Sequence, residues 1–275
     1  LLGIEFPLIR VLADMEIEGV LIDRENLVRF NDELKADISA LEQEIYALAG
    51  EEFNINSPKQ LGVILFEKLG LKAAKKTKTG YSTNAEVLEK LRSEHEIVEK
   101  ILQFRTLTKL NSTYGDGLLA VTDKDTGRIY SRFNQTVTVT GRISSAEPNL
   151  QNIPVRTPLG RELRKMFVAK DGCVLVDADY SQIELRVLAH ISGDENLCNA
   201  FKNNEDIHTA TASGVFGVAP DEVTPVMRSR AKTVNFGIIY GMGDFSLAKD
   251  LGISVREARE YIENYFARYP GVKRY

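Results

Sequence analysis

Apolar residues recur every three or four positions over residues 23–49, with polar residues between them. This period is typical of an amphipathic helix that buries one face. Two more helices are predicted after it, one beginning at Ser57-Pro58-Lys59-Gln60, which has the order of a capping box, and one capped by Thr83 together with Glu86. The apolar face of the first helix consists of Leu27, Phe30, Leu34, Ile38, Leu41, Ile45 and Leu48.

The hydrophobic period changes to two after Arg128. Residues 129–145 are rich in β-branched side chains and alternate in polarity, which predicts antiparallel strands. A short apolar run at 174–176 predicts another strand, and the lysine- and glycine-rich residues 72–80 predict a solvated loop. Later in the chain, Thr224 as a cap, Pro225 in the first turn and Gly241 at the end predict a helix over 224–241.

Composition places the chain among globular proteins that do not enter membranes. With 275 residues and 43% hydrophobic content, it can bury a core and form two or three subdomains. No apolar run approaches the roughly 20 residues that cross a bilayer, and the N-terminal residues lack a basic leader. Cys173 and Cys198 lack metal-ligand spacing, so we expect reduced, buried thiols in a cytoplasmic protein.

Charge is unevenly distributed, although the net charge is only −4. Residues 1–71 hold 14 acidic and 6 basic side chains, whereas residues 128–170 hold 8 basic and 2 acidic ones. A cluster of Lys and Arg attracts phosphates without regard to base sequence, so residues 128–170 are a candidate nucleic-acid surface.

Residues 177–186 read DADYSQIELR, directly after the apolar run at 174–176. In an extended segment Asp177 and Asp179 share one face, and a strand end that opens into a helix would present them at a water-accessible edge. Carboxylates there would suit a hard divalent ion such as Mg2+. The alternative is purely structural, with Asp179 as a helix cap and Asp177 as a solvated surface charge.

Four side chains recur every fourth residue along the predicted helix over 224–241. Two cations come first and two aromatic rings follow, an order that matches the phosphates and the base of a nucleoside triphosphate. The alternative is chance placement of cations and core aromatics at helical spacing. The four residues are Arg228, Lys232, Phe236 and Tyr240.

Several long motifs in order resemble the bacterial DNA polymerase I family, the family A DNA polymerases. The resemblance runs over essentially the whole chain and implies part of a polymerase domain, with an α+β, mostly helical, right-hand fold. The resemblance implies three regions: a helical thumb over 1–125, part of an antiparallel palm over 126–205, and part of helical fingers over 206–275. The motifs are DADYSQIELR (177–186), RSRAKTVNFGIIYG (228–241), TGRISSAEPNLQNIP (140–154), FNINSPKQL (53–61), STNAEVLEKLR (82–92), ILQFRTLTKLNSTY (101–114) and DIHTATA (206–212).

The resemblance implies attack of a primer 3′ hydroxyl on the α-phosphorus of a deoxynucleoside triphosphate, with two Mg2+ ions as cofactors. It implies Asp179 as a metal ligand, with the Tyr180 carbonyl as a second contact, and Arg228 and Lys232 as the triphosphate clamp. Lys232 would neutralise or protonate the leaving pyrophosphate. The other implied nucleotide contacts are His208 on a phosphate, Phe236 on the sugar and base, Tyr240 near the template position, Gln182, and Glu184 as the group that excludes a ribose 2′ hydroxyl.

Primer-template DNA is the other implied partner, and the protein would act as a monomer associated with the bacterial nucleoid. Ser57 could instead be a cap alone, and the amides after residue 148 could be ordinary turn formers. Amide and guanidinium groups there could also sense the minor-groove acceptors that all base pairs share. The implied DNA contacts are Asn56, Ser57, Arg105, Lys109, Ser112, Thr113, Arg142, Asn149, Gln151 and Asn152.

The chain departs from the family pattern in three places. Asp177 is acidic where relatives usually are not, which favours a surface role for it, and Ser229 replaces a frequent second arginine. Residues 1–275 do not include the family's His-Asp-Glu motif with the second metal-binding aspartate, so we expect those ligands in a segment beyond residue 275. A DNA-binding module without catalysis is therefore the alternative function. A single-subunit RNA polymerase shares the helix pattern, but Glu184 and its context fit a deoxynucleotide enzyme better.

Overall fold

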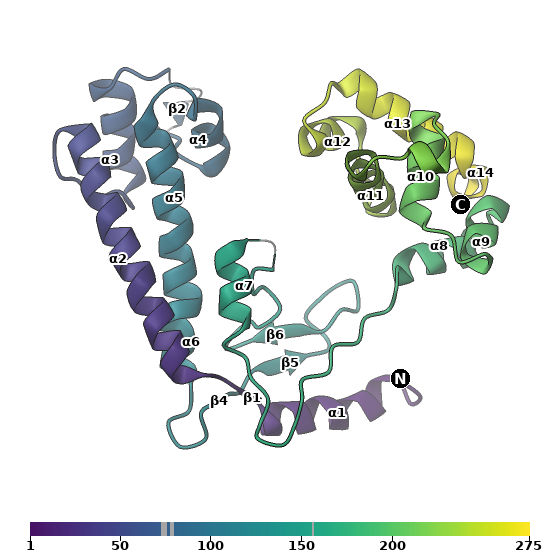
Figure 1. The fold of residues 1–275 in the computed structure, drawn as a ribbon, viewed down its shortest axis with the longest axis horizontal. Helices are drawn as coiled ribbons and strands as arrows, with labels where there is room; N and C mark the ends of the chain where they lie inside the picture. The colour runs from purple at the N-terminus through teal and green to yellow at the C-terminus, as the bar shows by residue number, and fades with distance from the viewer. Residues whose placement is uncertain (73–75, 78–79, 156) are drawn as a thin grey trace. The chain divides into compact units, whose positions relative to one another are not determined.

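The structure is a computed structural model that describes residues 1–72, 76–77, 80–155 and 157–275. The chain divides into two compact units, Leu1–Val176 and Asp177–Tyr275. The fold is α+β and mostly helical, as the sequence predicts, with short antiparallel strands in the first unit (Figure 1). The finer division into thumb, palm and fingers stays a prediction.

Two long helices lie side by side in the first unit, α2 (Arg24–Ala49) and α5 (Glu96–Leu110) (Figure 1). The predicted helix over 23–49 is confirmed: Asp23 accepts a hydrogen bond from the Asn26 N–H at 3.0 Å, and Gly50 ends α2 with a left-handed φ of 73°. The other helical segments of this unit are α1 (Glu5–Glu18), α3 (Pro58–Gly62), α4 (Ala85–Leu91), α6 (Asp116–Val121), α7 (Pro158–Arg164) and two π-helical turns, Val63–Lys68 and Asn111–Gly115.

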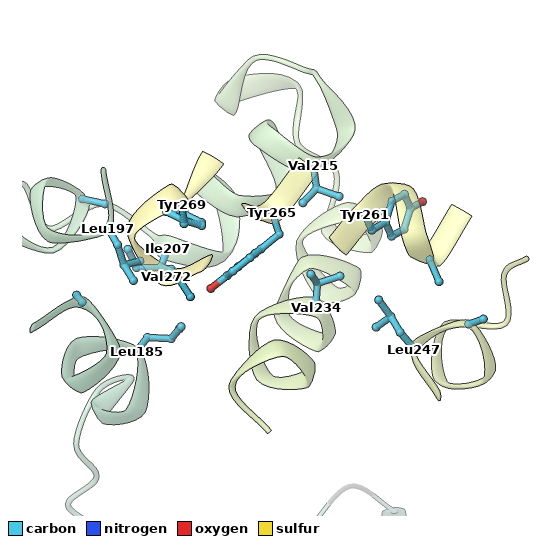
Figure 2. Close-up of a cluster of buried hydrophobic side chains, with 14 residues drawn as sticks. Leu185, Leu197, Ile207, Val215, Val234, Leu247, Tyr261, Tyr265, Tyr269 and Val272 are labelled. Atoms are coloured by element: carbon cyan, nitrogen blue, oxygen red, sulfur yellow. The ribbon is translucent and has the colours of Figure 1, made fainter. Parts of the chain in front are cut away.

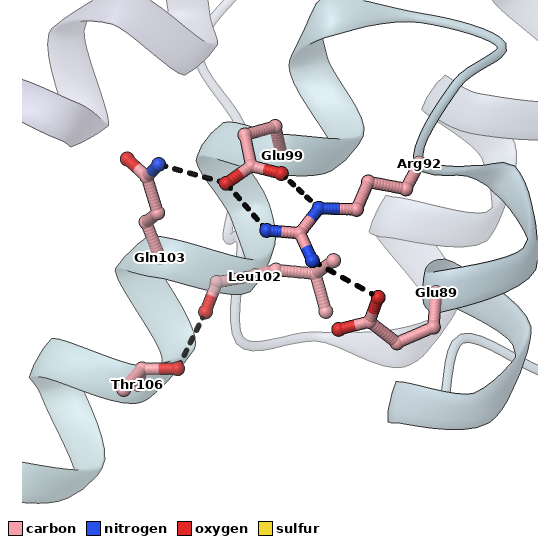
Figure 3. Close-up of polar contacts among 6 residues, drawn as sticks. All are labelled: Glu89, Arg92, Glu99, Leu102, Gln103 and Thr106. Carbon is pink, nitrogen blue, oxygen red and sulfur yellow. Dashed lines mark hydrogen bonds and ion pairs between the residues drawn. The ribbon is translucent and has the colours of Figure 1, made fainter. Parts of the chain in front are cut away.

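The apolar faces of these helices form the core of the first unit, where Ile45, Leu65, Leu88 and Ile101 are fully buried. On the surface above this core, Arg92 joins α4 to α5 (Figure 3). Its guanidinium binds both oxygens of Glu99 and reaches Glu89 at 3.3 Å, while Gln103 donates to Glu99 at 2.9 Å. Arg92 and Glu89 are exposed and Glu99 is half-buried, so water screens the network and it orients the helices more than it stabilises them.

One predicted cap is wrong, and the predicted capping box is only half formed. Asn84, not Thr83, caps α4, because the Asn84 side chain accepts from the Val87 N–H at 2.9 Å while Thr83 is buried and accepts from Arg105. Ser57 caps α3 as predicted, accepting from the Gln60 N–H at 3.4 Å. The reciprocal half of the capping box is absent, since the Gln60 side-chain oxygen accepts from the Asn54 N–H at 2.6 Å and not from the Ser57 N–H.

The antiparallel strands predicted after Arg128 form, but they are short. Strand β5 (Arg132–Asn134) pairs with β6 (Ser144–Ala146) so that Phe133 faces Ser145, and the alternating residues between them make the connection. Strand β1 (Val20–Leu21) pairs with β4 (Arg128–Ile129). Within the predicted loop at 72–80, β2 (Lys76–Thr77) pairs with β3 (Gly80–Tyr81), and residues 73–75 and 78–79 lie outside the described residues.

The strand predicted at 174–176 does not form. Val174, Leu175 and Val176 are 80%, 62% and 83% exposed, and none of the described residues forms a ladder with them. An extended segment becomes a strand only when a neighbour satisfies its backbone groups, and local sequence does not report that neighbour. The prediction of two buried cysteines is wrong for the same stretch, because Cys173 is exposed and only Cys198 is half-buried.

The second unit is helical and encloses one apolar core (Figure 2). Leu185, Val234, Leu247 and Tyr265 meet there from four different helices. Buried Asp194 connects two segments of the unit that are far apart in sequence. Its carboxylate accepts from the Leu197 N–H at 3.0 Å and from the Gly271 N–H at 2.7 Å. The helices are α8 (Ile183–Ser192), α9 (Glu195–Lys202), α10 (Ile207–Phe216), α11 (Pro225–Ile239), α12 (Asp244–Leu251), α13 (Val255–Arg268) and α14 (Pro270–Arg274).

Among the described residues, no helix combines the length and the apolar character that crossing a membrane requires.

Candidate functional site

Helix α11 carries the row of two cations and two rings that the sequence predicts. The Thr224 hydroxyl accepts from the Met227 N–H at 3.2 Å, Pro225 occupies the first turn, and Gly241 takes a left-handed φ of 70° just after the end. Ala231, Val234 and Asn235 of the same helix are buried, which fixes its rotation about its axis. As a result Arg228, Lys232 and Tyr240 are exposed and Phe236 is half-buried.

Arg228 is held by an acidic partner that sequence reasoning missed. Its Nε donates to Asp206 at 2.6 Å, and its two terminal nitrogens have no partner among the described residues. Asp206 is also the cap of α10, accepting from the His208 N–H at 3.0 Å and from the Thr209 hydroxyl at 2.9 Å. A carboxylate on Nε fixes the plane of the guanidinium while its outer edge stays available to a second anion.

These contacts set the charge state of Asp206. Burial acts to raise the pKa of its carboxyl, but the hydrogen bonds from Arg228, Thr209 and the His208 N–H outweigh burial and lower that pKa to about 2. The signal in the sequence was present, since an Asp at the start of DIHT is a good helix cap. Nothing in the sequence indicated that the same carboxylate would reach across to α11.

The Asp206 pKa predicts how stability depends on pH. A carboxyl whose pKa is lowered by folding stabilises the native state above its unfolded pKa of about 4, and this contribution is lost as the pH falls through about 2. Asp206→Asn, which keeps a capping oxygen, should therefore lower the urea midpoint at pH 6 by an amount that shrinks towards pH 2. The pair is half-exposed, so we expect less than about 1 kcal/mol. The exposed Asp221→Asn is the control, and a pH-independent difference would contradict the assignment.

His208 lies beside this pair and is only 4% exposed. Its Nδ1 is 3.0 Å from the Asn235 side-chain nitrogen, and its ring centroid is 6.1 Å from that of Phe236. Burial lowers the pKa of the imidazole, and the charges of Arg228 and Lys232 lower it further against the opposing effect of Asp206. The ring is therefore neutral at pH 7.

A polar cavity of about 310 Å³ adjoins Arg228. Gln182, which precedes α8, has a left-handed φ of 53°, and its side-chain oxygen is buried with no partner among the described residues. Such an orphaned acceptor and a strained backbone are common where a ligand binds. The cavity is lined by Ser181, Gln182, Arg186, Phe201, Asn204, Glu205, Asp206 and Arg228.

Arg186, the last residue of the DADYSQIELR motif, forms one wall of this cavity, although sequence reasoning assigned it no role in the site. Its Nε donates to the Ser181 carbonyl at 2.9 Å, and its guanidinium carbon lies 4.6 Å from the centroid of the Phe201 ring. These contacts fix the turn that leads into α8. Glu184 lies half-buried in the first turn of the same helix.

Asp179 and Tyr180 lie in an exposed, irregular segment before α8. The helix cap is Gln182, without a side-chain cap bond, so the alternative of Asp179 as a cap is wrong. The Asp179 carboxylate and the Tyr180 carbonyl are oxygen donors of the kind Mg2+ prefers. The described residues nevertheless contain no group of three or more His, Cys, Asp or Glu side chains that could hold a metal ion. The Asp179 and Tyr180 oxygens are therefore the right kind of ligand for such an ion, but they are too few to hold it by themselves.

The predicted DNA contacts among the helices of the first unit fall into two groups. Asn56 and Arg105 line an open cavity of about 540 Å³, where half-buried Arg105 donates to the Thr83 carbonyl and hydroxyl. Burial lowers the pKa of this guanidinium. The exposed residues Lys109, Ser112 and Thr113 follow one another at the end of α5 and in the π-helical turn after it.

The loop after β6 is held by its own amides. The Gln151 side chain accepts from the Ser145 N–H at 3.2 Å and donates to the Ile143 carbonyl at 2.9 Å, and Asn149 accepts from the Gln151 N–H at 2.9 Å. These bonds are those of turn formers, so both amides have a local structural role. Arg142, Asn149, Gln151 and Asn152 are exposed, and their contact with DNA stays a prediction.

Three comparisons with known proteins agree with one another. The family model described as DNA polymerase family A matches residues 24–275. DNA polymerase I of Caldicellulosiruptor bescii is 58% identical over 99% of this chain and 32% of its own length, and that of Bacillus subtilis is 56% identical over 99% and 31%. The chain thus spans about a third of the length of these relatives. The POL domain of Pol1 from M. smegmatis, solved in complex with DNA primer-template and dNTP, matches with a TM-score of 0.87 and 43% identity over 99% of this chain and 48% of that one.

Proposed function

The chain belongs to DNA polymerase family A, and we propose that it is the part of a DNA-directed DNA polymerase that binds the incoming deoxynucleoside triphosphate and much of the primer-template. The observation that carries the proposal is the row on α11, where Arg228 and Lys232 precede Phe236 and Tyr240 on the accessible side of the helix. Cations followed by rings match the phosphates and base of one nucleotide.

In the proposed reaction the primer 3′ hydroxyl gives up its proton to solvent and its oxygen bonds to the α-phosphorus. The bond from the α-phosphorus to the oxygen that bridges to the β-phosphorus breaks, and pyrophosphate leaves with that oxygen. The outer edge of the Arg228 guanidinium and the Lys232 ammonium would bind the triphosphate and offset the charge that grows on the leaving group. His208, neutral at pH 7, would add a hydrogen bond without a charge. Phe236 would pack on the sugar and base, and Tyr240 near the template position.

A divalent ion, which we propose to be Mg2+ in two copies, would activate the attacking oxygen and stabilise the leaving one. Asp179 and the Tyr180 carbonyl would supply part of its ligands, and the rest would come from residues outside this chain segment. The oxygen chemistry of these two groups supports the proposal. Gln182, with its unpartnered buried oxygen, would accept a hydrogen bond from the bound nucleotide or primer.

The proposed duplex surface combines the basic residues of 128–170 with the helix ends of the first unit. The primer-template named for the M. smegmatis structure supports DNA as the partner. We also propose that the protein is a monomer that associates with the nucleoid in the bacterial cytoplasm. Its bacterial relatives support this part of the proposal.

Nucleotide binding by this chain tests the proposal directly. We expect a fluorescent deoxynucleoside triphosphate to bind, Arg228→Ala to weaken it by about tenfold to a hundredfold, and Arg256→Ala to leave it unchanged. Arg256 is a fit control because its side chain is 89% exposed on α13. Duplex binding without any nucleotide binding would favour the alternative of a DNA-binding module. Primer extension by a longer protein, continued as its relatives are, would then decide whether synthesis occurs.

Glu184 tests the choice between deoxyribose and ribose. If its carboxylate fills the space of a 2′ hydroxyl, a ribonucleotide leaves that hydroxyl without a good partner, at a cost of about 1–3 kcal/mol or roughly ten- to hundredfold in selectivity. Glu184→Ala in the longer protein should raise ribonucleotide incorporation far more than it lowers deoxynucleotide incorporation. The measurement is the ratio of the two kcat/KM values, with the exposed Glu195→Ala as control. An unchanged ratio would remove Glu184 from this role.

A further inference from the structure

A chain of four buried polar side chains runs through the second unit and ends at His208. The Tyr269 and Thr211 hydroxyls are 3.2 Å apart, Thr211 donates to the Asn235 side-chain oxygen at 3.1 Å, and the Asn235 nitrogen is 3.0 Å from His208 Nδ1. All four residues are at most 4% exposed. Apolar side chains pack around them, and Tyr269 belongs to the cluster in Figure 2.

The burial of these four polar side chains calls for a structural or functional explanation. Each would be costly if left without a partner, and an apolar side chain would fill the same volume more simply. Thr211 and Asn235 reach neither solvent nor the cavity beside Arg228, since both are fully buried and neither lines that cavity. Their hydrogen bonds lead instead, one after the other, to the imidazole of His208, which lies beside Arg228 and Phe236.

The orientation of the Asn235 amide, with its oxygen towards Thr211, assigns the position of one proton. The Asn235 oxygen is already used by Thr211, so the Asn235 nitrogen faces His208 Nδ1. An amide nitrogen only donates, so Nδ1 accepts through its lone pair, and the single proton of a neutral imidazole lies on Nε2. Nε2 has no partner among the described residues.

We propose that Asn235 is a positioning residue that holds His208 as the Nε2–H tautomer, so that the imidazole offers one preset hydrogen-bond donor to a phosphate oxygen of the nucleotide. The phosphate part rests on the proposed function, whereas the tautomer does not. With the proton on Nδ1 instead, a lone pair on Nε2 would face the phosphate oxygen and repel it. Asn235 thus decides whether His208 attracts or repels the ligand.

The tautomer is measurable in the unliganded chain. The sequence holds only three histidines, so a ¹⁵N-histidine-labelled sample gives three pairs of ring-nitrogen signals, and His208→Gln identifies the pair of His208. We expect a protonated Nε2 and an unprotonated Nδ1 for His208 between about pH 7 and pH 8. The reverse assignment would overturn the proposal whatever the chain binds.

Asn235→Asp tests the link to the ligand, because a carboxylate of the same shape can accept from Nδ1–H but cannot donate to Nδ1. We expect the protonated nitrogen of His208 to become Nδ1 and the Kd for dATP to rise by about three- to thirtyfold. In a His208→Gln background the same substitution should add little, as in a double-mutant cycle. An equal rise in both backgrounds, or none in either, would show that Asn235 does not act through His208.

The two readouts separate the inference from the function it rests on. A chain with the Nε2–H tautomer that binds no dATP would refute the proposed function and, with it, the phosphate part of the inference. A chain that binds dATP but shows the Nδ1–H tautomer would refute the role of Asn235 alone. The ring-nitrogen signals of the unsubstituted chain identify the tautomer even if Asn235→Asp fails to fold.

Discussion

Asp179→Ala is expected to reduce nucleotide incorporation by about a thousandfold or more in a protein that continues through the rest of the polymerase domain. The substitution removes a carboxylate proposed to hold the ion that stabilises the charge of the reacting oxygens, and such stabilisation is worth several kcal/mol. Affinity for the primer-template should change little, because Asp179 lies in the proposed metal site and not on the proposed phosphate-binding surface. Single-turnover primer extension and duplex binding measure the two quantities.

Asp177→Ala is the matched control for this prediction. Asp177 lies two residues earlier in the same exposed segment and has the same side chain, but the family resemblance gives it no metal. We expect near-normal incorporation by this variant. Near-normal turnover of Asp179→Ala, or equal losses in both variants, would remove Asp179 from the catalytic centre.

Lys232→Ala is expected to lower kcat/KM by about a hundredfold to a thousandfold, with losses in both nucleotide affinity and rate. The ammonium would meet the triphosphate in the bound state and the pyrophosphate as it leaves, so its removal acts at both stages. Lys232 is exposed one turn beyond Arg228, which makes a folding defect a poor explanation. Pre-steady-state kinetics separate the two effects.

Two variants sharpen the test of Lys232. Lys232→Arg keeps a charge at the site and should recover part of the loss, whereas Lys273→Ala removes an exposed lysine from α14 and should have no effect. A loss confined to duplex affinity would instead place Lys232 on the DNA surface.

The elements that local sequence controls were predicted well. The helix over 23–49 and the helix over 224–241 both form, because their caps and their apolar periods lie within the segment itself. The pairing of β5 with β6 was predictable for the same reason, since the two strands are close in sequence. The family resemblance, carried by long motifs, is confirmed by the match over 24–275.

Predictions that depended on a distant partner failed or were not made. The strand at 174–176 needs a neighbour that the described residues do not supply. Asn84, not Thr83, caps α4, and Thr83 instead binds Arg105, which lies 22 residues later in the chain. Burial of Cys173 was expected from its residue type alone, and the segment around it is exposed.

By itself, the sequence determined the family, the helix that carries Arg228, Lys232, Phe236 and Tyr240, and the residue types available for chemistry. Only the tertiary structure decided how those groups are held. Asp206 meets Arg228 across 22 residues of sequence, and Asn235 meets His208 across 27. Hydrogen bonds and ion pairs depend on distances and directions that the packing of α10 against α11 creates, and no periodicity along one chain segment encodes them.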